Sequence, residues 1–271
     1  IFTSFFDDSI GGDTNGDGVS AGSNGDWRGL SLSNSHSSSL THTRVRFAGQ
    51  GNLPGVALDS SDASLSAVSI ESCLVDGMSL TDNSFPTVSG CSFIDNGGDA
   101  VDRVLVSALP GFSANTASGN GLNSIRQSAV ALQSNTTVVA DNMLNGALVF
   151  PTSLNIGTGL TLTLEQGVAV KSTTAAFTVA VSGTLITNGT VGNPVIFTSF
   201  FDDSIGGDTN GDGASAGSNG DWRGLSLTNS HSSSLTNTRV RFAGQGLLPG
   251  VALQSSDASL SAVSIESCLV D

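Results

Sequence analysis

Residues 160–171 read LTLTLEQGVAVK, and residues 177–190 read FTVAVSGTLITNGT. In both stretches apolar residues alternate with polar or small ones, and many of them are β-branched or aromatic. This period of two predicts short β-strands, because successive side chains of a strand point to opposite faces of its sheet. Glycine, asparagine, aspartate and serine separate the runs, so the sequence predicts an all-β protein built of short strands. The same alternation recurs over residues 30–32, 43–47, 65–70 and 195–198.

The chain of 271 residues contains a long internal repeat. Residues 196–271 copy residues 1–76 at an offset of 195. Repeats of this length predict an array in which each unit stacks on the next. We therefore expect one continuous β-solenoid over 1–271, with a full repeat at 1–195 and the start of the next repeat at 196–271. The two copies differ at only five positions, which are Val19/Ala214, Ser33/Thr228, His42/Asn237, Asn52/Leu247 and Asp59/Gln254.

A shorter period lies within the long one. Residues 67–77 resemble residues 86–97, with a lag of about twenty residues. Such a lag is typical of one coil of a β-solenoid, whose strands lie on those of the coil below. Asparagines at the turns then stack in ladders, and Asn96 and Asn142 are candidates for such positions. The sequence leaves the exact register of the coils open.

The region from residue 160 to 225 contains four diagnostic stretches: LTLTLEQGVAVK (160–171), FTVAVSGTLITNGT (177–190), NPVIFTSFFDDSIGGDTNGDG (193–213) and GDWRGL (220–225). Together they resemble the right-handed parallel β-helix repeats of large bacterial surface proteins, in the pectate-lyase-like superfamily. The resemblance implies a right-handed parallel β-helix with an acidic insertion between the FTS strand and the strand that follows GDW. It is specific for the fold and weak for activity, because a fold does not determine a function.

The acidic insertion resembles half of a calcium loop. Residues 11–18 read GGDTNGDG and return unchanged at 206–213. Asp13, Asn15 and Asp17 place oxygen-bearing side chains at alternate positions before a glycine, as in the first half of an EF-hand loop. The twelfth position, a bidentate glutamate in an EF-hand, falls on Asn24, and no helical pattern flanks the loop. Other acids would therefore have to complete the shell.

We predict Ca²⁺ in both loops, because calcium takes about six to eight oxygen ligands and crowded carboxylates repel one another without a cation. The competing interpretation is a surface turn rich in glycine, aspartate and asparagine that binds no metal. The predicted ligands of the first loop are the side chains of Asp13, Asn15, Asp17 and Asp26 and the backbone carbonyl of Val19. Their equivalents in the second loop are Asp208, Asn210, Asp212, Asp221 and Ala214, and further candidate ligands are Asp7, Asp8, Asp202 and Asp203.

The charge of the chain is acidic and local. Asp and Glu number 23 against 9 Lys and Arg, and Lys171 is the only lysine. Ten of the acids lie in the two loop regions. This balance argues against nucleic acid and against anionic membrane surfaces, which both require basic patches. Nothing in the sequence resembles a transmembrane segment or a signal peptide, and we expect the chain to be part of a longer array.

Several other residues could take part in catalysis or in ligand binding, but each also has a simpler structural explanation. Arg44 and Arg46 alternate and share one strand face, which is either a solvated outer face or a paired site for an anionic sugar. His36 lies in a serine-rich turn, where a neighbouring serine carries no signal for nucleophilic catalysis. Trp27 and Trp222 either pack the loop onto the solenoid or stack on a sugar. Isolated Thr-x-Thr pairs do not recur in every coil, as an ice-binding face would require.

The three cysteines, Cys73, Cys91 and Cys268, are interpreted as buried thiols, with a Cys73–Cys91 bridge as the alternative. For the whole chain we expect a structural segment of a repetitive adhesin, stalk or fibre, stiffened by Ca²⁺, at a bacterial cell surface and without enzymatic activity. The expected partners are further copies of the repeat end to end, with glycans or another cell surface beyond them. The alternative is a β-helix protein that binds or degrades a polysaccharide, and it would need a clustered acid and base that the strands lack.

Overall fold

The computed structural model describes residues 1–81, 83–128 and 131–270. The chain forms two compact units. Unit 1 comprises residues 1–104 and 111–125, and unit 2 comprises residues 105–110 and 126–271. Each unit is a solenoid of short parallel strands, so the predicted all-β solenoid class is confirmed. The described part of the chain contains no helix with the length and apolar character needed to cross a bilayer.

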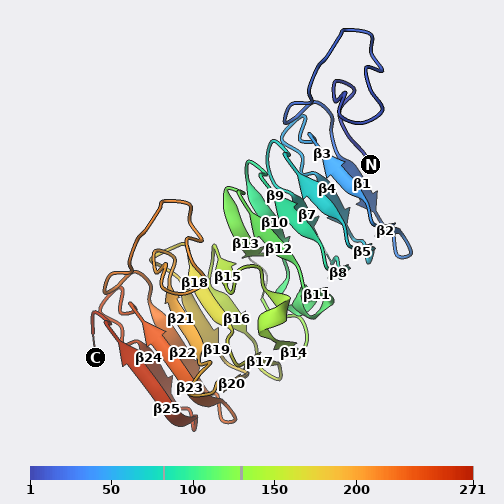
Figure 1. Cartoon of the computed structure of the whole chain (residues 1–271). Helices are drawn as coiled ribbons and strands as arrows, with labels where there is room; N and C mark the ends of the chain where they lie inside the picture. Colours follow the sequence, from blue (N-terminus) through green and yellow to red (C-terminus); the bar gives the residue numbers. More distant parts are fainter. Residues whose placement is uncertain (82, 129–130, 271) are drawn as a thin grey trace. The chain divides into compact units, whose positions relative to one another are not determined.

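In unit 1 each coil contributes one strand to each of three parallel sheets, and successive coils stack strand on strand (Figure 1). The first sheet contains β1 (Leu30–Ser33), β4 (Val56–Asp59), β7 (Met78–Thr81), β10 (Asp99–Val104) and β13 (Leu122–Gln127). The second contains β2 (Ser39–Thr41), β5 (Ser64–Ser66), β8 (Thr87–Ser89) and β11 (Phe112–Ser113). The third contains β3 (Arg44–Arg46), β6 (Ser69–Glu71), β9 (Ser92–Ile94) and β12 (Thr116–Ser118).

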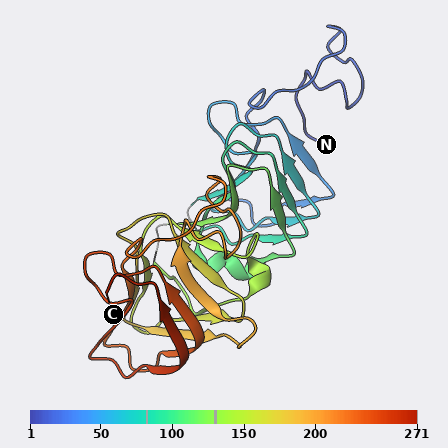
Figure 2. The same ribbon diagram turned by 60° about the vertical axis from the view of Figure 1, so that its left-hand side comes forward.

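Unit 2 repeats this plan, and its strands surround a common core (Figure 2). One face contains β14 (Thr136–Val138), β17 (Thr161–Glu165) and β20 (Thr184–Asn188), and the next contains β15 (Leu148–Phe150), β18 (Ala169–Ser172) and β21 (Val195–Ser199). The long strands β23 (Ser234–Arg241) and β25 (Ser259–Glu266) continue both faces. The last face contains β16 (Leu154–Ile156), β19 (Thr178–Val181), β22 (Gly224–Thr228) and β24 (Val251–Gln254). The 3-10 helices are η1 (Val106–Gly111) and η2 (Ala140–Asn142).

The predicted stacking of coils is confirmed, and the structure supplies its register. Leu65 pairs with Val88 and Ile70 pairs with Phe93, so the lag between these two coils is 23 residues. These four side chains are fully buried and belong to the apolar core of unit 1.

The prediction of one strand over residues 65–70 is wrong. Ala67 lies between β5 and β6 with a φ of 52°, in the left-handed region, and turns the chain sharply from one sheet to the next. His42, Gly90 and Ala114 occupy the same corner in the other coils of unit 1, with φ of 48°, 59° and 52°. Asn237, which replaces His42 in the second copy, has a φ of 44°. Histidine and asparagine both tolerate this conformation, which explains why the substitution leaves the corner intact.

An asparagine ladder supports a neighbouring turn of unit 1. Asn96 is buried, and its Oδ1 accepts a hydrogen bond from the Cys73 N–H at 3.0 Å. Its Nδ2 donates to the Ile70 carbonyl at 3.1 Å and to Oδ1 of Asn120 at 2.7 Å. The turn position predicted for Asn96 is confirmed. Asn120, which the sequence analysis did not single out, forms the next rung, and its Nδ2 donates to the Phe93 carbonyl at 2.9 Å.

Cys73 and Cys91 lie at different corners of the coil. The Cys73 N–H donates to Asn96, at the corner that the ladder supports. The Cys91 N–H donates to Asn115 at 2.8 Å, at a different corner. Both are buried thiols, and the alternative of a bridge between them is not realised. Burial raises the pKa of Cys73 to about 11, so the thiol stays protonated and unreactive near neutral pH.

Replacing Asn96 by alanine should destabilise unit 1 by about 2–4 kcal/mol, because the Cys73 N–H and the Ile70 carbonyl would be buried without partners. Chemical denaturation followed by circular dichroism would measure the loss. Asn52→Leu is the matched control, because the second copy already carries leucine at that position. If Asn96→Ala lowered the free energy of unfolding no more than Asn52→Leu does, the ladder would not support the turn.

Candidate metal centre

Each acidic loop is an insertion at the start of a coil. In the second copy it leaves β21 at Ser199 and returns to the solenoid at Trp222, directly before β22. The Trp222 ring is 1% exposed, lies 5.8 Å from the Phe177 ring, and donates from Nε1 to the Arg241 carbonyl at 2.7 Å. The interpretation of Trp222 as packing the loop onto the solenoid is confirmed. Trp27 makes the equivalent hydrogen bond to the Arg46 carbonyl, also at 2.7 Å.

Three carboxylates converge in each loop. Oxygen atoms of Asp8, Asp13 and Asp17 all lie within 4.8 Å of one another, and those of Asp203, Asp208 and Asp212 do the same. In the first loop the structure brings the predicted ligands Asp13 and Asp17 together with Asp8, which was only a further candidate. In the second loop Asp203 joins the equivalent predicted pair in the same way. Repulsion within such a trio is reduced only if protons, solvent or a cation compensate the charge.

Backbone hydrogen bonds shape the first loop around Asp13. Its Oδ1 accepts from the Gly16 N–H at 2.6 Å, and its Oδ2 accepts from the Gly18 N–H at 3.1 Å. Both glycines have positive φ, which lets their N–H groups turn inward toward one carboxylate. Asn15 donates from Nδ2 to Asp17 at 2.9 Å, so its amide lies beside the trio. Val19, which was predicted to supply a backbone carbonyl, has a fully exposed side chain. In the second loop, Asn210 occupies the position of Asn15 and Ala214 that of Val19.

Asp8 has one oxygen that the protein leaves unsatisfied. Its Oδ2 accepts from the Ser20 N–H at 2.6 Å, but its Oδ1 is buried without a hydrogen-bond partner. Asp203 repeats both features: Oδ2 accepts from the Ser215 N–H at 2.6 Å, and Oδ1 is buried and unpartnered. An ionised oxygen in this position is costly unless a cation or proton compensates it. The donor set consists only of oxygen, which suits a hard cation such as Ca²⁺.

The remaining predicted acids hold the base of the loop. Asp26 accepts hydrogen bonds from the Ser4 hydroxyl and from the Ser23 N–H, and Asp221 does the same with Ser199 and Ser218. They lie outside the trio of carboxylates, so their predicted role as metal ligands stays a prediction.

Asp7 also belongs to the base, where Arg46 binds it at 3.1 Å, and the equivalent Asp202–Arg241 distance is 2.7 Å. Burial raises the pKa of Asp7, but hydrogen bonds from Ser9 and Thr3 and the charge of Arg46 outweigh burial and lower it below the usual value.

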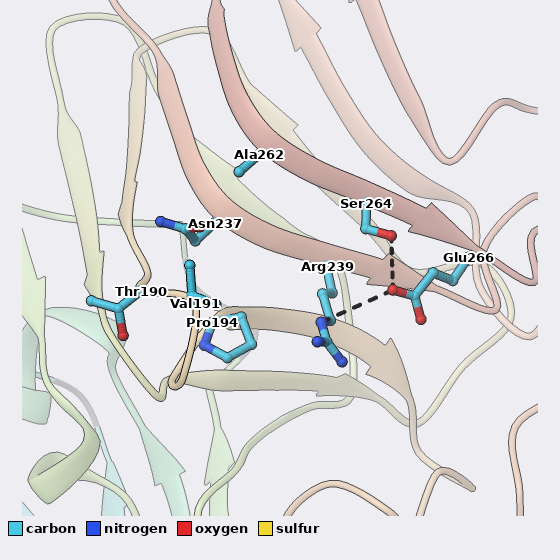
Figure 3. A pocket seen from close by; sticks show the side chains of 8 residues that line it. All are labelled: Thr190, Val191, Pro194, Asn237, Arg239, Ala262, Ser264 and Glu266. Carbon is cyan, nitrogen blue, oxygen red and sulfur yellow. Dashed lines mark hydrogen bonds and ion pairs between the residues drawn. The ribbon is translucent and has the colours of Figure 1, made fainter.

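A depression of about 300 Å³ lies on the outer face of unit 2 beside Arg239, which with Arg241 repeats the pair Arg44 and Arg46 in the second copy. Figure 3 shows Arg239 and Glu266 among the residues that line it, together with Val191 and Pro194. Glu266 Oε1 accepts from the Ser264 hydroxyl at 2.8 Å and lies 4.0 Å from Arg239 Nε. Both arginines of the pair are therefore compensated by carboxylates, which favours a structural role for them.

In comparisons with known proteins, no family model, no curated protein and no solved structure matches the chain.

Arg241→Gln should lower the free energy of unfolding by about 2 kcal/mol, because Asp202, whose side chain is 3% exposed, would lose its charged donor. Arg239→Gln is the matched control, since its side chain is 50% exposed and its contact with Glu266 is 4.0 Å long. It should cost about 0.5 kcal/mol or less. Thermal unfolding of both variants gives the comparison, and equal losses would contradict the assigned role of Arg241.

Proposed function

We propose that the chain is a structural segment of a repetitive extracellular adhesin, stalk or fibre, and that calcium bound in the acidic loops stiffens it. The observation that carries the proposal is the buried, unpartnered carboxylate oxygen of Asp8, repeated in Asp203. In each loop it belongs to a trio of carboxylates within 4.8 Å of one another. A divalent cation would give that oxygen a partner and compensate the charge of the trio.

The attachment of the loop supports a mechanical role. The Asp26 N–H donates to the Phe47 carbonyl at 3.0 Å, and the Asn24 side chain reaches the Cys73 carbonyl at 3.5 Å. The base of the loop therefore contacts two successive coils of unit 1. A cation that orders the loop would also restrain these coils relative to each other, because the same short segment carries both sets of contacts.

The repeat supports an array rather than a diversified site. The copies differ at five positions of 76, and none of the trio carboxylates is among them. Parallel coils offer open strand edges above and below, so further copies of the repeat are the partners that fit best end to end. A loop of this kind would fill where calcium is about millimolar, which favours an extracellular location such as a bacterial cell surface. Other cell surfaces or glycans would be the targets of such a fibre.

A polysaccharide-binding or polysaccharide-degrading protein is the second candidate, and the depression beside Arg239 favours it. We place it second because the arginine is compensated by Glu266 and the acid trio lies in an inserted loop and not on a strand. We propose that the chain is not an enzyme. Steady release of unsaturated sugars from pectin or alginate, lost in Arg239→Ala, would reverse this order.

Calcium at about 5 mM should raise the thermal unfolding midpoint relative to chelator, since a ligand at ten times its dissociation constant stabilises by about 1.4 kcal/mol. The doubly substituted variant Asp8→Asn with Asp203→Asn should lose this shift, because both unsatisfied oxygens lose their charge. Asp59→Gln is the control for lost acidity, because the second copy already carries glutamine there.

Isothermal titration of the same proteins separates binding from stability. Heat that saturates near millimolar calcium and disappears in the double variant alone supports the proposal. A wild-type protein that neither binds nor is stabilised at about 5 mM calcium would reduce both loops to plain turns.

A further inference from the structure

The two acidic loops have the same internal structure. The Gly16 N–H donates to Asp13 at 2.6 Å, and the Gly211 N–H donates to Asp208 at the same distance. Their other backbone hydrogen bonds to carboxylates also agree, from Gly18 and Ser20 in the first loop and from Gly213 and Ser215 in the second. Any difference in their behaviour must therefore come from what surrounds them.

The surroundings differ at one threonine. Thr14 in the first loop is exposed, whereas its equivalent Thr209 is 1% exposed. Lys171 of β18 lies against the second loop, and its Nζ donates to Thr209 Oγ1 at 2.8 Å and to the Gly207 carbonyl at 3.2 Å. These two contacts flank the trio residue Asp208.

Apolar packing accompanies the lysine. Ile205 at the start of the second loop packs on Ala147, Ala169 and Ile196, which lie side by side on the outer face of unit 2. All four residues of β18 are buried as a result, although strands of a solenoid usually expose alternate side chains. The second loop thus covers the outer face of the coils that precede it.

A lysine that is 0% exposed needs acceptors and nearby negative charge, because burying an unpaired ammonium is very unfavourable. Burial lowers the pKa of Lys171 to about 8, while Asp203, Asp202 and Asp208 act in the opposite direction. The loop supplies both the acceptors and the charge. In return, the lysine fixes the backbone on each side of Asp208 and compensates part of the repulsion among the acids.

We propose that Lys171 is a positioning residue that docks the second acidic loop on the solenoid and keeps it ordered without a metal ion. The docking is independent of the proposed function.

Hydrogen–deuterium exchange read by mass spectrometry tests the proposal on the intact chain. Peptides from the two loops are distinguishable by mass, because residue 19 is valine and residue 214 is alanine. In chelator, Thr209→Val should speed the exchange of the amides of residues 211–215 about tenfold or more, the effect of one hydrogen bond to a charged group. The matched variant Thr14→Val should change the exchange of neither loop.

Lys171→Met gives a second measurement of the same contact and should speed the exchange of the second loop to a similar extent. Exchange of residues 211–215 that stays at the wild-type rate in Thr209→Val would overturn the proposal. Thr209→Val retains the buried lysine and a side chain of the same size, so it decides the matter if Lys171→Met does not fold.

The calcium arm is read separately. Slower exchange of residues 16–20 and 211–215 on addition of calcium supports the proposed function. If calcium slows neither loop but the exchange of residues 211–215 in chelator still depends on Thr209, docking by Lys171 stands and the calcium function fails.

Discussion

Backbone hydrogen bonding between successive coils is the interaction on which the rest of the structure depends. Strands of three to five residues make few contacts of their own, and each finds its partners only in the coils above and below. The bonds continue through the corners, where the His42 N–H donates to the Ser66 carbonyl and the Ala67 N–H to the Ser89 carbonyl, both at 3.0 Å. This constraint places equivalent positions of successive coils on top of one another, at offsets of 22 to 27 residues where no long loop is inserted.

The acidic loops are additions to this scaffold and depend on it for their shape. Their bases are held by ion pairs to Arg46 of β3 or Arg241 of β23, and by hydrogen bonds to coil carbonyls. With the base fixed, three carboxylates converge at a place where one oxygen has no protein partner. The scaffold thus concentrates negative charge that a cation can compensate, and in the second loop Lys171 already compensates part of it.

Much of this could be predicted from sequence, and the misses have physical causes. The alternation of apolar and polar residues identified the strands. The long repeat and the shorter period of about twenty residues identified the stacking of coils, because strands and stacking both leave patterns in the sequence. The break at Ala67 was missed because alanine rarely adopts a left-handed φ, and only tertiary packing imposes it there. Asp13 and Asp17 were found by their spacing. The partnership of Asp8 and the docking of Lys171 were not, since both result from how the chain folds back on preceding residues.

Crystals grown with and without calcium would test the central claim most directly, through anomalous difference maps of both loops. Bound calcium should give one peak in each loop within about 2.6 Å of the trio carboxylates, including Oδ1 of Asp8 and of Asp203. Maps without a peak in either loop at about 5 mM calcium, with those two oxygens bound to water or to a backbone N–H, would contradict it.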